Sequence, residues 1–341
     1  LSGEDEPSVS FLSEGFRSEL LVEGLEEAAC LTLAPDGRIF FAERTAGRVR
    51  ILESDGTLLG RSFATLTTAQ RPTQGIRGLD LSPEFDLDGR VFVSYVDRTN
   101  QLEILRFLDN GVDQGVSATP LPLLLPVGTQ RLGGEIRTID GNLLIALGDA
   151  GEPGLASSTN PSLAGSILRV TPSGLPAIGN AAPGSLVFAN GFREPSDLVQ
   201  DPSSGDLLVI ERRSDRSSVV RTRVGENYGW PATREVGSGS DRVITWLGTE
   251  FGPVACAFYD DTAFGPEFEG NLLLAGDTNH EIRRLILDSS DPTVLIAEEP
   301  FARFGDGDVN RPTDLLLLGD GSILVSTSGA IWRIYPIAES P

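Results

Sequence analysis

The sequence predicts an all-β protein that folds as a six-bladed β-propeller of four-stranded antiparallel blades. One unit recurs six times along the 341 residues: an apolar strand, a turn that ends in glycine, and a second apolar strand. The repeat interval of 51 to 65 residues suits four strands of about 5 to 6 residues each with their loops. Several copies continue into a third strand that contains arginine and alternates with the β period.

Each unit is expected to begin with a hairpin. In chain order the six copies are LTLAPDGRIFFAER, LDLSPEFDLDGRVFVSYV, IRTIDGNLLIALGD, DLVQDPSSGDLLVIER, CAFYDDTAFGPEFEGNLLLAGD and DLLLLGDGSILVSTSG. Successive turn glycines lie 52, 52, 64, 65 and 51 residues apart, at Gly37, Gly89, Gly141, Gly205, Gly270 and Gly321. Glycine supplies the positive φ that tight hairpin turns need, so these positions mark the tips of the hairpins.

The remaining strands complete the blades. Third-strand candidates are RVRILE, LEILRF, SILRVT, EIRRLIL and AIWRIYP. Because a propeller closes its ring with strands from both ends of the chain, we expect SVSFLSEGFRSELLVEG to contribute a strand to the last blade. No linker divides the chain, so residues 11–341 are predicted to form one propeller domain behind an acidic tether, residues 1–10. Candidate site residues then lie beside the inner strands, on the axis.

The charge balance excludes two classes of partner. The formal net charge is -22, and all 27 basic residues are arginine. Such a field disfavours nucleic acid and anionic membrane surfaces. The use of arginine in place of lysine fits a coding bias, and the acidic excess fits a salty exterior. The sequence leaves the choice between these two explanations open. No apolar run of about 18 residues is present, so no transmembrane segment is expected.

The first residues suggest export. The chain contains no methionine, and its polar opening LSGEDEPSVS is typical of a tether that follows a removed signal or lipid-anchor segment. We therefore expect an extracytoplasmic protein, either periplasmic or secreted. The two cysteines, Cys30 and Cys256, begin apolar runs in different repeats. Two buried free thiols fit that placement, whereas a disulfide remains an alternative in an oxidising compartment.

A family resemblance rests on GENYGWP, residues 225–231. This stretch resembles the Asn-Tyr-Gly-Trp-Pro signature of the glucose/sorbosone dehydrogenase family, and further stretches extend the resemblance over nearly the whole chain. The resemblance implies a quinoprotein propeller that oxidises an aldose at its anomeric carbon with pyrroloquinoline quinone (PQQ) held above calcium. Such chemistry needs a general base, cations or amides for the cofactor carboxylates, and oxygen ligands for the metal.

The expected base is replaced. The family pattern has histidine just ahead of a Gly-Gly pair, and here Arg131 precedes Gly133 and Gly134. Arginine cannot accept a proton near neutral pH, so Arg131 at this catalytic position is predicted to be non-functional as a base. Asp149 is kept from the family's Gly-Asp-Gln-Gly turn. The sole histidine, His280, lies in a later repeat and is expected to be structural or exposed.

The cofactor clamp implied by the resemblance is half retained. GFREPSDL resembles the family's Gly-His-Arg-Asn-Pro-Gln-Gly-Leu, so Arg193 is kept while Glu194 replaces an asparagine and Ser196 a glutamine. A glutamate that faces a tricarboxylate would weaken binding by like-charge repulsion. NRPTDLLLLGDG keeps Arg311 and has Thr313 for a second arginine, and the chain offers no lysine. The predicted cofactor-binding positions are therefore Arg193, Arg311, Glu194 and Thr313.

The metal stretch is also altered. Where the family has Glu-His-Gly-Pro, this chain reads Glu211-Arg212-Arg213, and two arginines argue against calcium there. Two other short acidic spacings are candidate calcium sites, and their residues are Asp149 with Glu152, and Asp306 with Asp308 and Asn310. Solvated turns carry such residues too, and the second stretch lacks the glycine that an EF-type loop needs at its sixth position.

The aromatic signature has a structural interpretation as well. Tyr228 and Trp230 are expected to fill a buried corner between blades and to satisfy one polar atom each. Their presence supports the fold more than the chemistry.

Three functions follow from these residues. The first is an extracytoplasmic propeller that has lost quinone chemistry and acts as a binding or assembly subunit, with protein partners in an envelope or extracellular assembly. The second is an active PQQ- and calcium-dependent aldose dehydrogenase with a rearranged pocket. The third is a calcium-dependent hydrolase of the lactonase kind, which an arginine-lined funnel would exclude. If Arg131, Arg193 and Arg311 converge, the funnel is an anion site for a sugar or small anionic ligand.

Overall fold

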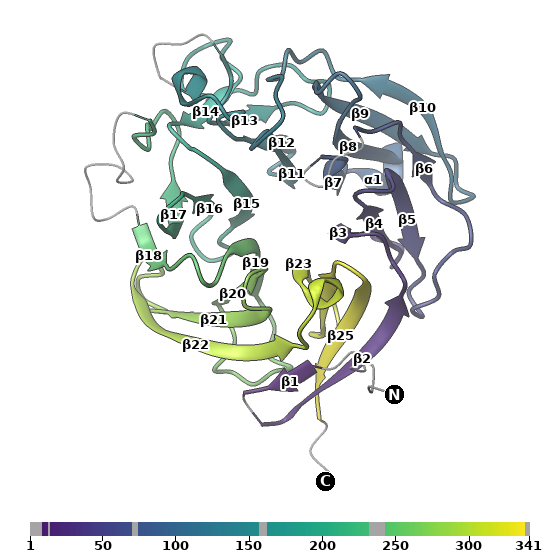
Figure 1. Cartoon of the computed structure of the whole chain (residues 1–341), viewed down its shortest axis with the longest axis vertical. Helices are drawn as coiled ribbons and strands as arrows, with labels where there is room; N and C mark the ends of the chain where they lie inside the picture. The colour runs from purple at the N-terminus through teal and green to yellow at the C-terminus, as the bar shows by residue number, and fades with distance from the viewer. Residues whose placement is uncertain (1–8, 13, 70–73, 157–161, 232–242, 338–341) are drawn as a thin grey trace.

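Six β-sheets stand around a central axis in the computed structural model, and the prediction of a six-bladed propeller of four-stranded antiparallel blades is confirmed (Figure 1). The structure describes residues 9–12, 14–69, 74–156, 162–231 and 243–337. Residues 1–8 of the predicted tether lie outside this range. The innermost strands contact one another in sequence around the ring, so they surround the axis.

The first three blades follow one another along the chain, each with its strands in order from the axis outward. Blade 1 contains β3 (Ala28–Leu33), β4 (Ile39–Glu43), β5 (Arg48–Leu52) and β6 (Ala64–Thr65). Blade 2 contains β7 (Ile76–Leu81), β8 (Arg90–Val96), β9 (Leu102–Asp109) and β10 (Gly115–Pro120), with the short helix α1 (Phe85–Asp88) between its first two strands. Blade 3 contains β11 (Gly133–Ile139), β12 (Asn142–Leu147), β13 (Ser166–Val170) and β14 (Val187–Asn190), with the 3-10 helix η1 (Pro153–Ala156).

The last three blades repeat the pattern, and blades 5 and 6 each gain one strand from the N-terminal segment. Blade 4 contains β15 (Pro195–Gln200), β16 (Leu207–Arg212), β17 (Ser217–Thr222) and β18 (Val243–Leu247). Blade 5 contains β19 (Pro253–Tyr259), β20 (Asn271–Gly276), β21 (Glu281–Leu287), β22 (Leu295–Phe304) and, at its outer edge, β1 (Val9–Phe11). Blade 6 contains β23 (Pro312–Leu317), β24 (Ile323–Thr327), β25 (Ala330–Pro336) and β2 (Phe16–Glu23), preceded by the 3-10 helix η2 (Asp308–Asn310).

The predicted turn glycines all lie between the first and second strands of their blades. Each has a positive φ, between 60° and 89°, in the left-handed region that favours glycine. The five predicted third strands coincide with β5, β9, β13, β21 and β25. The repeat seen in the sequence is therefore the blade itself.

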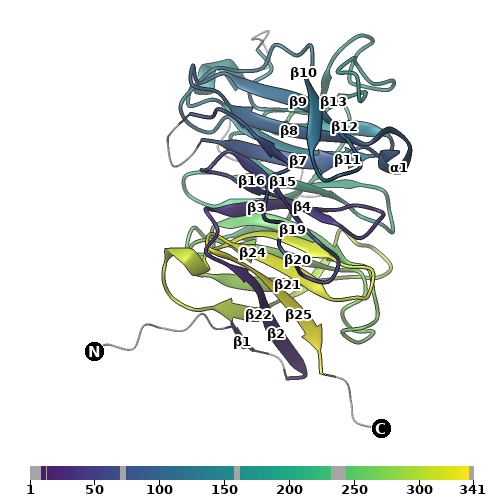
Figure 2. The same cartoon turned by 90° about the vertical axis from the view of Figure 1, so that its right-hand side faces the viewer.

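The N-terminal segment closes the ring, as expected, and does so across two blades. Strand β2 pairs with β25 and completes blade 6, whereas β1 pairs with β22 of blade 5 (Figures 1 and 2). Phe16 anchors the crossing, because its ring lies 4.8 Å from that of Phe264 and 4.9 Å from that of Phe301, measured between centroids. These aromatic contacts join the two blades at the site of closure.

Six separate apolar clusters hold neighbouring blades together, one at each blade-to-blade interface. The cluster between blades 1 and 2, for example, packs the fully buried Phe40 against Phe63 and Phe85. Because both faces of each blade are covered near its centre, the second strands form nearly continuous apolar runs; these strands are β4, β8, β12, β16, β20 and β24. Cys30 and Cys256 lie in two different clusters as buried free thiols, so the disulfide alternative is not realised.

All six innermost strands have an irregular register near their first residues. The shift falls at equivalent places in β3, β7, β11, β15, β19 and β23. A bulge of this kind redirects a side chain out of the regular alternation. Arg77, Ser196 and Thr313 lie at these shifts, and all three face the axis.

Three aspartates fasten alternate blades to the next. Asp80 of blade 2 accepts a hydrogen bond from the backbone N–H of Thr138 at 2.6 Å. In the same way, Asp197 of blade 4 accepts from the N–H of Cys256 at 2.8 Å, and Asp314 of blade 6 accepts from the N–H of Leu31 at 2.6 Å. Each aspartate also accepts from the backbone N–H of the residue that follows it.

Arg137 connects two of these aspartates, Asp197 and Asp314, with Glu135. Its Nη2 lies 2.9 Å from Asp197 and 3.6 Å from Asp314, and its Nη1 lies 2.7 Å from Glu135. All three acids are buried. One guanidinium therefore balances carboxylates from three of the six blades.

Among the residues that the structure describes, no helix is long and apolar enough to cross a bilayer.

Replacing Arg137 with methionine keeps most of the side-chain volume and removes the cation. We expect a loss of about 3–5 kcal/mol in the free energy of unfolding, because Glu135, Asp197 and Asp314 would remain buried without their partner. Urea denaturation of the whole chain measures this. The matched control is Arg90→Met, which removes a more exposed ion pair to Asp88 and should cost about 0–1 kcal/mol. Equal losses in the two variants would contradict the axial role of Arg137.

Candidate functional site

A cavity of about 640 Å³ lies on the axis, at the end where the inner strands begin and the second strands finish. Residues from all six blades line this cavity. Its place on the axis is the one expected for a propeller site. Its volume is in the range of pockets that bind small molecules. The charged lining residues are six arginines and six acids: Arg44, Arg77, Arg131, Arg137, Arg212 and Arg311, with Glu27, Glu135, Glu194, Asp197, Asp277 and Asp314.

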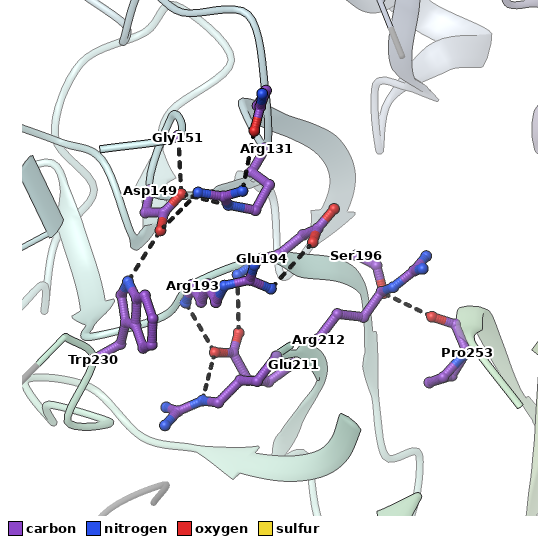
Figure 3. Close-up of polar contacts among 12 residues, drawn as sticks. Arg131, Asp149, Gly151, Arg193, Glu194, Ser196, Glu211, Arg212, Trp230 and Pro253 are labelled. Carbon is purple, nitrogen blue, oxygen red and sulfur yellow. Dashed lines mark hydrogen bonds and ion pairs between the residues drawn. The ribbon is translucent and has the colours of Figure 1, made fainter. Parts of the chain in front are cut away.

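Arg131, at the predicted base position, forms an ion pair with Asp149. Its Nε lies 2.8 Å from Oδ1 of Asp149, which is completely buried at the end of β12. The same carboxylate accepts hydrogen bonds from the indole Nε1 of Trp230 at 3.1 Å and from the N–H of Gly151 at 2.9 Å (Figure 3). A guanidinium has no lone pair with which to accept a proton, and this one is held by a buried anion. The structure therefore brings the two predicted catalytic residues together as a salt bridge.

The predicted clamp residues of blade 4 are engaged with one another. Arg193 lies 3.8 Å from Glu194 in an ion pair, and its guanidinium carbon lies 5.7 Å from the centroid of the Trp230 ring (Figure 3). Glu194 lines the axial cavity, whereas Arg193 is not among the described residues that line it. Of the three arginines expected to converge, only Arg131 and Arg311 face the cavity.

The clamp residues of blade 6 do face the axis. Arg311 lies 3.6 Å from Glu27 in an ion pair, and its guanidinium donates to the hydroxyl of Ser328 at 3.2 Å. Thr313 lies at the register shift of β23, where its hydroxyl donates to the carbonyl of Ala28 and lies 2.8 Å from that of Ser326. Both side chains thus have partners within the protein.

The altered metal stretch at the end of β16 is a hydrogen-bonded cluster. Glu211 is completely buried and accepts from the N–H of Arg193 at 2.8 Å (Figure 3). It also accepts from Nε of Arg213 at 3.1 Å. Burial raises the pKa of Glu211 to about 7, although Arg213 opposes the shift. Arg212 lines the axial cavity and forms an ion pair of 3.4 Å with Asp277. The carboxylate of Glu211, which could be an oxygen ligand, is paired with the cation of Arg213 instead.

The other metal candidates are spread apart. Asp149 forms an ion pair with Arg131. Glu152 is exposed, and so is Asp308 in η2. Asp306 pairs loosely with Arg303 at 3.5 Å, with 89% of its side chain exposed. Within the described part of the chain, no group of three or more His, Cys, Asp or Glu is arranged to hold a metal. Calcium takes about six to eight oxygen ligands, so these residues offer it no ready site, and the calcium assignments stay predictions.

The aromatic signature forms a corner, as its structural interpretation predicts. Tyr228 is completely buried, stacks on Phe192 at 4.8 Å between ring centroids, and donates its hydroxyl to the carbonyl of Arg221 at 2.8 Å. Trp230 reaches Asp149 and so links this corner to the site. His280 is half-buried, with Nδ1 3.0 Å from the carbonyl oxygen of Gly305, and it is not among the described cavity residues.

Sequence reasoning did not single out Arg44, Arg77, Glu135 or Arg137 as site residues. A signal was present: an Asp-Leu pair lies near the start of the inner strand in repeats four and six, and it marks Asp197 and Asp314, the two aspartates that pair with Arg137. Burial raises the pKa of Glu135 to about 8, against the opposing effect of Arg137, and raises the pKa of Asp314 to about 6. The floor of the cavity therefore carries carboxyl groups that titrate near neutral pH.

Comparison with known proteins agrees with this architecture. The sequence profile of the glucose/sorbosone dehydrogenase family matches residues 25–333. The chain belongs to that family. A proposed oxidoreductase (glucose dehydrogenase) from Thermus thermophilus is 28% identical, with a TM-score of 0.80 over 94% of this chain and 100% of that one. No curated protein matches the sequence significantly.

Two more distant structures of this sugar dehydrogenase-like fold are also similar. The PQQ-bound aldose sugar dehydrogenase from Streptomyces coelicolor is 23% identical, with a TM-score of 0.79 over 98% of this chain and 99% of that one. The apo form of the soluble aldose sugar dehydrogenase from Escherichia coli is 18% identical, with a TM-score of 0.81 over 94% and 99%. At these identities the two matches show the fold alone.

The raised pKa of Glu135 predicts a pH dependence of stability. Between its ordinary pKa near 4.5 and about 8, the folded protein keeps a proton that the unfolded chain has released. Stability from this group is therefore present at low pH and lost as pH rises through that window. We expect Glu135→Gln to gain thermal stability relative to the wild type on going from about pH 5 to about pH 9. A difference in melting temperature that does not change with pH would contradict this.

The salt bridge of Arg131 and Asp149 predicts coupled stabilities. Arg131→Leu should lower the free energy of unfolding by about 3 kcal/mol, because it strands a buried carboxylate. Asp149→Asn in the same chain should recover part of that loss, with a coupling of about 1–3 kcal/mol in a double-mutant cycle measured by denaturant unfolding. Strictly additive losses would show that the two side chains do not depend on each other.

Proposed function

We propose that this sugar dehydrogenase-like propeller has lost quinone-dependent sugar oxidation and acts outside the cytoplasm as a binding or assembly subunit. The observation that carries the proposal is the ion pair of 2.8 Å between Arg131 and the buried Asp149. It stands at the position where the family resemblance requires a base. The axial cavity would then bind a small sugar or anion without oxidising it.

The surrounding residues support the same conclusion. Arginine remains protonated at any physiological pH, and moving Arg131 aside would strand the carboxylate of Asp149. Arg193 and Arg311, which the resemblance assigns to the cofactor carboxylates, are paired with Glu194 and Glu27. The described residues supply no ready calcium ligand set. Base, clamp and metal residues are thus all altered together.

The alternative is an active PQQ- and calcium-dependent aldose dehydrogenase with a rearranged pocket. Family membership favours it, as does the fold shared with a PQQ-bound aldose sugar dehydrogenase. The six guanidinium groups of the cavity would also suit an anionic cofactor. The same arginine lining counts against a calcium-dependent hydrolase, which needs converging oxygen ligands.

Location and partners belong to the proposal too. Family resemblance supports a periplasmic or secreted protein, and cell fractionation tests it. Affinity purification from the native envelope or medium tests the assembly role. A chain that proved monomeric, partnerless and redox-active would overturn the proposal.

Reconstitution provides the direct test of activity. Wild-type protein incubated with PQQ and calcium should show no aldose-dependent dye reduction and no calcium-dependent rise in melting temperature. Arg131→His should also stay inactive, because Glu194 and the arginines at the end of β16 remain. An active member of the family, treated in parallel, verifies the assay. Dye reduction by the wild type that requires both quinone and calcium would establish the alternative instead.

A further inference from the structure

Two long uncharged segments include the outermost strands of blades 2 and 3, β10 and β14 (Figure 1). Residues 114–130 contain no charged side chain, and neither do residues 170–192, although charged residues make up 22% of the chain. Of the formal charge of -22, the whole interval from residue 114 to residue 192 carries only -1. The two segments are thus neutral in a molecule that is otherwise strongly acidic.

Both segments also turn large apolar side chains toward solvent. From Leu121 to Leu125 the burial alternates, so that Leu121 and Leu125 enter the cluster between blades 2 and 3 while Pro122 and Leu124 face outward. Leu124 is 91% exposed, and Ile178, in the loop between β13 and β14, is fully exposed. Within the described ranges, no other large apolar side chain is as exposed as these two. An outward position of this kind is ordinarily occupied by a polar residue.

The two segments are in contact and form one surface. Gly174 of the second segment approaches the first so closely that a Cβ added to it would lie 2.8 Å from Cδ of Pro122 and 3.4 Å from Cβ of Leu121. Leu175, the next residue, is 59% exposed. The surface that these segments share is named the neutral rim, and its outward apolar residues are Pro122, Leu124, Leu175 and Ile178.

The loop that carries Ile178 is held by its own hydrogen bonds. The guanidinium of Arg169 donates to Oδ1 of Asn180 at 3.0 Å and to the carbonyl of Ile178 at 3.2 Å, and it lies 4.9 Å from the centroid of the Phe188 ring. In return, Nδ2 of Asn180 donates to the carbonyls of Arg169 and Ser185, at 2.8 and 2.7 Å. Because the loop is already ordered, little conformational entropy is lost when a partner covers it.

The composition of the neutral rim is that of an interface. Contiguous apolar side chains on a soluble protein mark sites of association. Edge segments that stay exposed are usually protected by charged side chains, and these segments have none. Pro120, Pro122 and Pro126 have no N–H to donate, so a partner strand cannot extend the sheet along this stretch. The contact is therefore made by side chains.

The charge distribution indicates which partner fits. A basic protein would be attracted to the acidic remainder of the surface and would not need an uncharged contact. A second copy of this chain carries the same charge of -22, so contact through an acidic face is opposed by like-charge repulsion. Contact through the neutral rim places apolar groups against apolar groups and keeps the like charges farther apart.

We propose that two copies of this chain associate through the neutral rim about a two-fold axis. A two-fold contact is self-complementary, so the rim of each copy covers that of the other. Residues 114–127 and 171–188 present 17 exposed residues, somewhat fewer than the 20–30 per partner, roughly, of a standard interface. We therefore expect a dissociation constant of about 1–100 μM. The inference goes beyond the proposed function, because the dimer depends neither on the loss of sugar oxidation nor on its retention.

Sedimentation velocity of the full chain, at roughly 1–200 μM, tests the proposal. Wild type should pass from monomer to dimer as its concentration rises. The dimer should be stronger in about 0.5 M than in about 0.05 M NaCl, because salt screens the repulsion between the two acidic copies. Leu124→Asp and Ile178→Asp should each weaken association at least about 10-fold, since each places a carboxylate in an apolar contact.

The matched control is Ile296→Asp. Ile296 is 62% exposed on β22 of blade 5, across the ring from blades 2 and 3 (Figure 1), and its replacement should leave the dimer unchanged. The melting temperatures of the three variants, measured on dilute monomer, should match that of wild type because all three side chains are exposed. If an aspartate variant does not fold, Leu124→Ser and Ile178→Ser should still weaken the dimer.

Four results would overturn the proposal. The first is a wild type that stays monomeric at the highest concentration in both salts. The second is a dimer that salt weakens, and the third is a dimer that survives both rim variants or is equally lost in Ile296→Asp. The fourth is growth into larger oligomers, which a closed two-fold contact does not allow. The dye-reduction assay on the same samples is independent, since redox activity in a rim-dependent dimer would overturn only the loss of oxidation.

Discussion

The guanidinium of Arg137, placed among buried carboxylates on the propeller axis, is the interaction on which the architecture depends. Asp197 and Asp314 hold the next inner strand by its backbone N–H, and both are balanced by this one cation. Apolar clusters fill the spaces between blades, but they do not direct the ring to a common centre. A buried cation shared by several blades does so, because each carboxylate is costly to bury unless it reaches that cation. Arg137 and its paired acids also line the axial cavity, so this part of the cavity wall has a fixed geometry.

Buried positions of the blade and positions that face the cavity differ in how well they tolerate substitution. The corner at Tyr228 and Trp230 is built into the blade interface, and a change there would cost packing. The residue at Arg131 faces a cavity, so a replacement needs only a partner for its charge. Asp149 is that partner, and the same carboxylate also accepts hydrogen bonds from Trp230 and Gly151. The blade therefore keeps these hydrogen bonds while a permanent cation stands at Arg131.

The sequence predicted the fold because its signals are local. Glycine at each hairpin tip needs only its own φ, and alternation along a strand needs only neighbouring residues. The site was predicted in part, through positions that a family motif labels, such as Arg131, Arg311 and Thr313. Arg44 and Arg77 escaped notice because their approach depends on register shifts and on contact between blades, which no single repeat encodes. The same reasoning explains Arg193, which the motif assigned to the cavity and which packs against Trp230 instead.

The closure of blade 6 has a consequence for how the chain reaches its native state. Phe16 pairs with Pro336, so the sheet that completes the ring joins residues separated by nearly the whole sequence. Blades 1 to 4 each use strands from one continuous segment and can form as the chain emerges during synthesis. The early strand β2 must wait, unpaired, until its partner β25 has been made. Assembly of the ring is therefore a late event of high contact order, and its speed limits how soon all six blades can share one axis.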